Sequence, residues 1–274
     1  ERVIGHLRPT PTRFHYVFSL REISLVFRGL FHVESNCMDS TETASRMWVH
    51  EAIRVFHDRL VDEREQQWFM KEIFLVANQH FKYIAPQLDR GEFNDKDTTL
   101  MCHDFIEDEE SSTSRAYREC TKLATTRTAL DAFLEEYNGA FPGDGQLELV
   151  FFFDAMAHIA RFCRILKQGG NALLIGGPGC GKKTVALLGS FIAGYQVEEV
   201  LKSEEPTPHH YRDHLKRAIM QSAIEGVKMV YLVCDVELPN EDFMAQLNMV
   251  VNHKTVGDFF SVEEEAEVVV HVRP

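Results

Sequence analysis

The sequence predicts an α/β protein with two parts, a helical subdomain over residues 1–140 and an α/β subdomain with a parallel sheet over residues 147–274. Three observations support this class. Apolar residues recur at helical spacing through the first part, and predicted strands alternate with predicted helices in the second. A glycine-rich turn also separates a strand from a helix in the second part. The turn-forming segment Phe141-Pro142-Gly143-Asp144-Gly145 is the expected boundary between the two parts.

Composition limits the function classes. The 274 residues are 45% hydrophobic and 26% charged, which is typical of one or two globular domains. The 29 Lys and Arg against 42 Asp and Glu give a net charge of −13, which argues against general nucleic-acid binding. No apolar run approaches the roughly 20 residues that cross a bilayer, so no membrane partner is expected. The six cysteines include no Cys-x-x-Cys pair and are expected to be reduced.

The first part contains several helix signals. A capping box at Ser19 and Glu22 opens a helix with an apolar stripe, and Gly29, near the end of that helix, is its expected C-cap. The stripe consists of Ile23, Val26, Phe27 and Leu30. A second stripe follows over residues 49–60, and Asp62 with Glu65 predicts another capping box. The chain begins at Glu1 close to a periodic segment, so a piece of a longer protein is expected.

Residues 89–115 are rich in acidic residues, Ser and Thr, which predicts a long exposed loop or hairpin. A helix is then expected from Tyr117 to Tyr137, ending at Asn138-Gly139. After the boundary, the pattern predicts this order: helix 149–168, strand 171–175, helix 181–193, strand 196–200, a helix opened by Thr207-Pro208, and strand 227–234.

The segment after the strand expected at 171–175 carries the strongest chemical signal. It reads Gly176, Gly177, Pro178, Gly179, Cys180, Gly181, Lys182, Lys183 and Thr184. Glycines let backbone N–H groups converge on an anion, a helix N-terminus adds positive potential, and a lysine here reaches terminal phosphates. The segment therefore predicts a nucleotide phosphate loop (P-loop); the alternative is a glycine-rich turn that only connects strand to helix.

The P-loop departs from its usual pattern at one position. The residue after Lys182, where a Ser or Thr hydroxyl would bind Mg²⁺, is Lys183, and Thr184 comes one residue late. One residue rotates a helical side chain by about 100°. Thr184 is thus the candidate metal ligand, and the case for Mg²⁺ is weaker than the case for nucleotide.

The apolar run Met229–Val233 leads into Cys234, Asp235 and Glu237. In P-loop NTPases, an acidic residue at such a strand end holds the Mg²⁺ shell or orients the attacking water. Asp235 is the first candidate catalytic residue and Glu237 the second. Many buried strands end in a surface Asp, so this signal depends on its spacing from the P-loop.

Four stretches resemble dynein heavy chains, the axonemal branch more than the cytoplasmic one. They are residues 15–29, 48–60, 153–175 and, in two pieces, 235–248 with 258–260. The first two, which include His15-Tyr16-Val17-Phe18-Ser19-Leu20-Arg21-Glu22 and Trp48-Val49-His50-Glu51-Ala52, set the chain apart from a generic P-loop protein. The stretches span nearly the whole chain in the family's order.

The resemblance implies a ring of linked AAA+ modules. Residues 1–140 would be the helical lid of the third module, and residues 147–274 the P-loop α/β part of the fourth, which would be incomplete. It further implies that ATP or ADP binds at the fourth module in a structural or regulatory role, with weak or no hydrolysis by this piece alone. The implied partners are neighbouring modules and other dynein chains, with microtubules reached only through parts not present. The implied location is the cytoplasm and cytoskeleton, in a cilium or flagellum axoneme.

The resemblance also suggests residue roles. Cys234 falls where the metal-binding Asp of the family would sit, and Asp235 falls where the catalytic Glu would sit. Arg21 resembles the lid arginine that touches the γ-phosphate of the third module. Two alternatives stay open: an independent P-loop ATPase or kinase working through Lys182 and Asp235, and a non-enzymatic interaction module that kept the fold without nucleotide.

Overall fold

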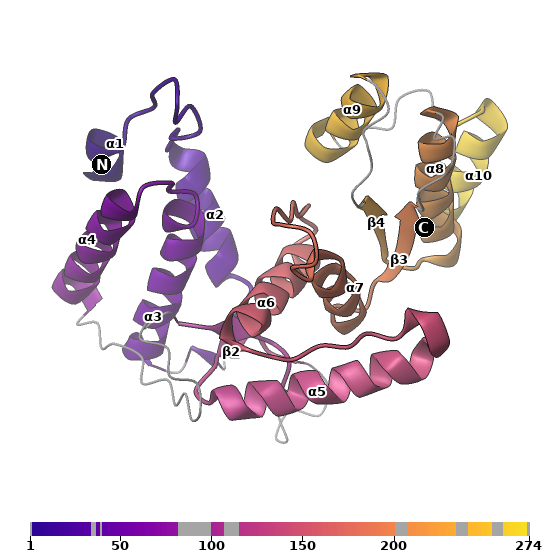
Figure 1. Ribbon diagram of the computed structural model, residues 1–274. Helices are drawn as coiled ribbons and strands as arrows, with labels where there is room; N and C mark the ends of the chain where they lie inside the picture. Colours follow the sequence, from indigo (N-terminus) through magenta and orange to yellow (C-terminus); the bar gives the residue numbers. More distant parts are fainter. Residues whose placement is uncertain are drawn as a thin grey trace. The chain divides into compact units, whose positions relative to one another are not determined.

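A computed structural model describes residues 2–33, 37–38, 40–81, 100–106, 115–200, 208–233, 241–253 and 260–272 (Figure 1). The chain divides into two compact units, residues 1–130 and 131–274. Within the described residues, no helix is both long enough and apolar enough to cross a membrane.

The N-terminal unit is mainly helical (Figure 1). Its elements are α1 (Arg2–His6), α2 (Leu20–Leu30), α3 (Thr41–Ala52), a π-helix (Ile53–His57), α4 (Glu63–Phe81), β1 (Cys102–His103), β2 (Arg118–Glu119) and the start of α5 (Leu123–Ala140). Helix α3 packs against both α2 and α4. The buried core between them contains Leu7, Tyr16, Phe18, Val49, Ala52, Ile53, Leu60, Phe69, Ile73 and Ala77.

The predicted capping box of α2 is confirmed. The Ser19 hydroxyl accepts from the Arg21 N–H, and the Glu22 carboxylate accepts from the Ser19 N–H at 2.7 Å. The predicted apolar stripe is only partly buried, since Val26 is 4% exposed but Phe27 is 51% exposed. Gly29 lies near the end of the helix, as predicted, but it is not the C-cap, because the helix continues through Leu30 and its C-cap is Phe31.

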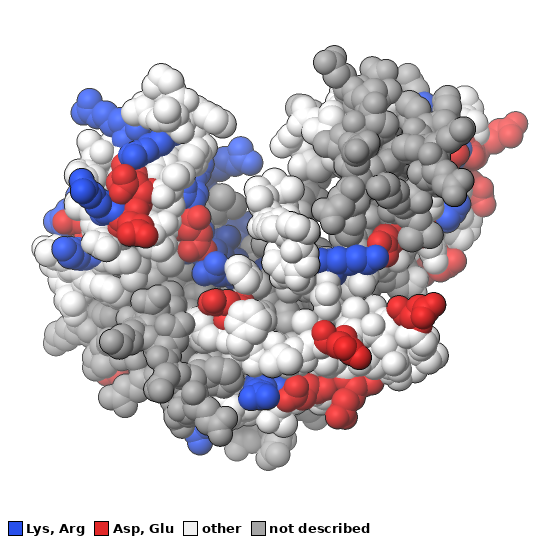
Figure 2. Space-filling view, in the orientation of Figure 1, with Lys and Arg blue, Asp and Glu red and all other residues white. Residues whose placement is uncertain are grey.

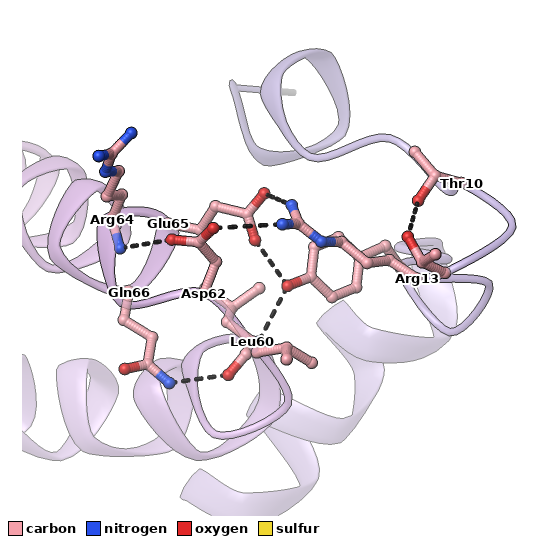
Figure 3. A network of polar contacts seen from close by, with 10 residues as sticks. Thr10, Arg13, Leu60, Asp62, Arg64, Glu65 and Gln66 are labelled. Atoms are coloured by element: carbon pink, nitrogen blue, oxygen red, sulfur yellow. Dashed lines mark hydrogen bonds and ion pairs between the residues drawn. The ribbon is translucent and has the colours of Figure 1, made fainter.

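The second predicted capping box, at Asp62 and Glu65, is formed only in part (Figure 3). Asp62 accepts from the Arg64 N–H at 2.8 Å at the start of α4. Glu65 instead uses its two carboxylate oxygens to bind the Tyr16 hydroxyl and the Arg13 guanidinium. These contacts with residues distant in the sequence therefore replace the hydrogen bond that the Glu65 carboxylate would accept from the Asp62 N–H in a full capping box.

Part of the segment expected as an exposed loop is buried. Residues 100–106 include Met101 and Phe105, which are 4% and 3% exposed. Strands β1 and β2 pair antiparallel, so a hairpin-like pairing does form. Residues 89–99 and 107–114 lie outside the described residues. Tyr117 precedes β2 and is not in a helix, so that part of the helix prediction is wrong; the helix is α5, which starts at Leu123.

The second unit combines helices with a parallel strand pair. Its elements after α5 are a 3₁₀ turn (Gly143–Gly145), α6 (Phe153–Lys167), α7 (Lys182–Ile192), β3 (Gln196–Val200), α8 (Pro208–Glu225), β4 (Met229–Val233), α9 (Glu241–Asn248), a π-helix (Met249–His253) and α10 (Val262–Val272). Strands β3 and β4 run parallel, with Gln196 beside Met229. Helix α6 packs on α7 around Phe162, Leu166, Ala186 and Ala193.

The strand predicted over Asn171–Ile175 is absent, and this segment has no regular structure. Leu173 and Ile175 are 86% and 87% exposed. An apolar segment becomes a strand only when its backbone groups pair with a neighbour. Within the described residues of this unit, β3 and β4 pair only with each other. The other features of the predicted class, a helical part followed by an α/β part with parallel strands, are confirmed.

Charged side chains of both signs are interspersed on the face of the N-terminal unit shown in Figure 2. Several form ion pairs between elements. Arg2 of α1 pairs with Glu72 of α4 at 2.8 Å, and Arg46 of α3 pairs with Glu119 of β2 at 2.7 Å. These pairs link segments that are far apart in the sequence.

Candidate functional site

The P-loop is an exposed turn that leads directly into α7. Gly179 and Gly181 have φ of 75° and 81°, and Gly181 is the N-cap of the helix. Residues with a Cβ rarely adopt such positive φ values, so the glycines are what allow this turn. The first N–H groups of α7 have no partner within the helix and carry its positive dipole end. The turn thus presents hydrogen-bond donors and positive potential to solvent.

Lys182, the first residue of α7, reaches back over the loop. Its Nζ donates to the carbonyl oxygens of Gly176 at 3.0 Å and Gly177 at 2.8 Å, and lies 3.9 Å from Sγ of Cys180. An ammonium group carries three N–H donors, and these three contacts direct all of them at atoms of the loop. The positive charge is therefore held at the loop, where an anion would bind.

The loop folds tightly on itself. A Cβ built on Gly176 would lie 2.7 Å from Sγ of Cys180, a distance that requires one of the two groups to move. The exposed Cys180 thiol thus lies inside the turn that Gly176 and Lys182 close. A group bound against Gly176 and Lys182 is therefore expected to reduce access to the thiol.

Lys183 faces a different environment from Lys182. Its ammonium forms an ion pair with Glu199 of β3; the two side chains are 51% and 24% exposed. Burial and the nearby charge of Glu199 raise the pKa of Tyr137 of α5, and the charge of Lys183 opposes this shift. The ring of Tyr137 also packs edge-on against Phe191 of α7 at 5.3 Å. Lys183 thereby connects the first turn of α7 to β3.

The described P-loop residues do not fit a Mg²⁺ site of the usual kind. Mg²⁺ takes oxygen ligands, and the residue after Lys182 supplies an ammonium paired with Glu199. Thr184, the candidate metal ligand, is half-buried on α7 one residue further along. That step is about 100° around the helix axis and about 1.5 Å along it.

The other candidate residues are not brought to this loop by the described structure. Asp235 and Glu237, with Cys234, lie outside the described residues, directly after the end of β4 at Val233. Arg21 is exposed in the first turn of α2 in the N-terminal unit, where its N–H donates to Ser19. Arg21 and the P-loop belong to different units.

Sequence reasoning missed Glu199 and Tyr137. The signal for Glu199 was present, since two acidic residues, Glu198 and Glu199, interrupt a short predicted strand that follows the helix carrying Lys182 and Lys183. Carboxylates on a strand that packs next to a lysine-rich helix start indicate an ion pair. Nothing in the spacing of Tyr137 indicated that it would lie near that pair.

Comparisons with known proteins give a consistent picture. The family model described as "P-loop containing dynein motor region D4" matches residues 147–274, and the model described as "AAA+ lid domain" matches residues 1–90. Dynein axonemal heavy chain 3 of Homo sapiens is 31% identical over 273 residues, which cover 97% of this chain and 6% of the relative. Dynein axonemal heavy chain 1 of Mus musculus is 29% identical over 279 residues, covering 99% of this chain and 6% of the relative.

Dynein axonemal heavy chain 10 of Homo sapiens is 31% identical over 269 residues, which cover 98% of this chain. The chain spans about 6% of the length of each of these relatives. In each case the similarity runs across both the helical part and the P-loop part.

Proposed function

The chain belongs to the dynein heavy chain family, axonemal type, and on that premise we propose that its P-loop binds ATP or ADP within the AAA+ ring of a dynein motor. In this proposal, residues 1–140 are the lid of the third module and residues 147–274 are the P-loop part of the fourth. The matches of the lid model to residues 1–90 and of the dynein motor model to residues 147–274 support this division.

The observation that carries the proposal is the position of Lys182. Its ammonium lies over the turn between Gly176 and Gly181, at the N-terminus of α7. Glycine conformation, helix dipole and lysine charge act together on whatever occupies the turn, and a phosphate chain is the ligand that uses all three. A turn that only connects two elements would need none of this charge.

The role of the bound nucleotide would be structural or regulatory. Occupancy of the fourth module would bias the rigid-body positions of neighbouring modules and so modulate ATP-driven movement along microtubules. Asp235 and Glu237 remain the proposed catalytic residues, and Thr184 the proposed hydroxyl ligand if a metal binds. Arg21 would serve the nucleotide of the third module.

Family membership favours a ring module over an independent P-loop ATPase or kinase. The proposed partners are the neighbouring AAA+ modules and other dynein chains, and microtubule contact would occur through other parts of the motor. The axonemal relatives support a place in the cytoskeleton of a cilium or flagellum.

The Cys180 thiol provides a site-specific test. Trypsin releases residues 168–182 as one peptide that contains Cys180 as its single cysteine, so its alkylation can be followed by mass spectrometry even if other nucleotide sites are present. The experiment measures the alkylation rate of Cys180 against ADP and ATP concentration, in the protein at its natural length. Bound nucleotide should cover the thiol and slow alkylation.

Lys182→Met keeps the length of the side chain but removes the charge, and it should raise the half-protecting nucleotide concentration by about tenfold or more, because a charged hydrogen bond is lost. Lys228→Met is the matched control, since Lys228 is exposed and lies before β4. Protection of Cys180 that Lys182→Met leaves unchanged would contradict the proposed site. Failure of any nucleotide to protect Cys180 would favour the non-enzymatic interaction module.

A further inference from the structure

The residue after Lys182 points to a property of the proposed site. We infer that the P-loop binds a nucleoside di- or triphosphate without requiring a divalent cation, because Lys183 and its ion pair with Glu199 replace the oxygen ligand that Mg²⁺ would use. This inference rests on the proposed nucleotide site. It concerns how the ligand is held, and it can fail while nucleotide binding itself holds.

The residue after Lys182 cannot act as a ligand for Mg²⁺. Mg²⁺ in a P-loop is held by the Ser or Thr hydroxyl that follows the lysine, together with phosphate oxygens and water. Here that position carries an ammonium, which has no lone pair to give and repels a dication. This position therefore lacks an oxygen ligand for Mg²⁺ and instead carries a positive charge that repels the metal.

Lys183 is held at its position by an ion pair. Its ammonium pairs with Glu199 on β3, while the ring of Tyr137 packs on Phe191 of the same helix. Moving Lys183 aside to admit a metal would break a contact between α7 and β3. The positive charge therefore stays in the first turn of α7, beside the P-loop.

Thr184 does not replace the missing hydroxyl, because it lies one position later on the helix. Its hydroxyl is carried by a half-buried residue one position later on α7, about 100° around the helix from Lys183. A hydroxyl there faces a different side of the helix from the one that follows Lys182 directly. The phosphate chain would instead meet the Lys182 ammonium and the first N–H groups of α7, which have no partner within the helix.

The experiment compares Cys180 protection with Mg²⁺ and with EDTA, in the protein at its natural length, using ADP and ATP as probes. The half-protecting concentration should change by less than about twofold between the two conditions, since the residue after Lys182 offers no oxygen ligand to a metal. Lys183→Ser restores the usual hydroxyl and leaves residues 168–182 as the same tryptic peptide. It should make ATP protection about tenfold stronger with Mg²⁺ than with EDTA.

Glu199→Gln is the matched control, because it breaks the ion pair but keeps an ammonium, and no hydroxyl, in the residue after Lys182. It should stay insensitive to Mg²⁺. Protection of the unmodified protein only in the presence of Mg²⁺ would overturn the inference while supporting the proposed nucleotide site. Mg²⁺ dependence in Glu199→Gln, or none in Lys183→Ser, would overturn the role given to Lys183. No protection in any condition would instead defeat the proposed function.

Discussion

The Tyr16 hydroxyl donates to Oε2 of Glu65 at 2.7 Å and joins two segments of the N-terminal unit that lie 49 residues apart (Figure 3). The same hydroxyl accepts from the Val61 N–H at 2.9 Å, and Arg13 pairs with Glu65 as well. Tyr16 is 1% exposed, and burial followed by the bond to Glu65 raises its pKa. This network fixes the segment before α2 to the start of α4.

Replacing Tyr16 by Phe should lower the free energy of unfolding by about 1–3 kcal/mol, because the Val61 N–H and a Glu65 oxygen would lose a buried partner. Urea denaturation followed by tryptophan fluorescence measures this, since Trp48 and Trp68 both belong to the N-terminal unit. Thr12→Val removes an exposed hydroxyl from the same region and should cost less than about 0.5 kcal/mol. An equal loss in both variants would show that the network adds nothing.

The contact between α6 and α7 depends on a glycine. A Cβ on Gly189 would lie 2.6 Å from Cδ1 of Phe162, whose ring is buried. Gly189→Ala should therefore destabilise this packing by about 1–3 kcal/mol, seen as faster hydrogen exchange in peptides from α7. Gly139→Ala in α5 meets no atom within 4 Å and should be neutral or stabilising. Unchanged exchange in Gly189→Ala would mean that Phe162 can move aside without cost.

Stability should fall with acid partly through His103. Burial lowers the pKa of His103 to about 4, with Asp104 opposing the shift and Arg118 adding to it. The unfolded chain, with a histidine pKa near 6.5, therefore binds more protons than the folded chain between these two values. The contribution of His103 to the free energy of unfolding is therefore fully present above pH 6.5 and is lost as the pH falls from 6.5 to about 4. Between pH 7 and pH 5 the loss should be about 2 kcal/mol.

His103→Gln should remove most of this dependence, because glutamine can still donate to Thr126 Oγ1, which lies 2.7 Å from His103 Nε2, but does not titrate. The measurement is the urea midpoint of both proteins at pH 7 and pH 5, followed by tryptophan fluorescence. A pH dependence that is the same in both proteins would show that His103 does not contribute.

Under the proposed function, nucleotide bound by the P-loop should modulate the movement of the motor without being its main source of energy. In the motor at its natural length, Lys182→Met should slow microtubule gliding by about fivefold, in the range of a modest coupling between sites, while ATP turnover continues. Gliding assays and phosphate release measure the two quantities, with Lys228→Met as the control. Complete loss of turnover would mean that this site hydrolyses the ATP that drives movement.

Local signals in the sequence predicted local structure well. The capping box at Ser19 and Glu22 forms where the pattern placed it, and the helix predicted from residue 181 begins at Lys182 with Gly181 as its N-cap, because these contacts lie within a few residues. The prediction for Glu65 was wrong because its partners, Tyr16 and Arg13, lie 49 and 52 residues away. The spacing of residues along one helix cannot show that distant residues compete for the Glu65 carboxylate.

Strand formation was less predictable for the same reason. The apolar segment 171–175 has the composition of a strand, yet composition does not say which backbone will pair with it. At the site, glycine spacing and Lys182 were readable from the sequence, whereas the pairing of Lys183 with Glu199 depends on how β3 lies against α7. Which charged side chains pair depends on how the helices and strands pack, and local sequence patterns do not show this directly.

The most direct measurement of the central claim is the alkylation rate of Cys180 as ADP is added to the protein. If the turn between Gly176 and Lys182 holds a phosphate chain, the rate falls with ADP concentration to a saturated minimum, and Lys182→Met shifts that curve to higher ADP concentrations. An alkylation rate that stays constant at every ADP and ATP concentration would contradict nucleotide binding by this loop.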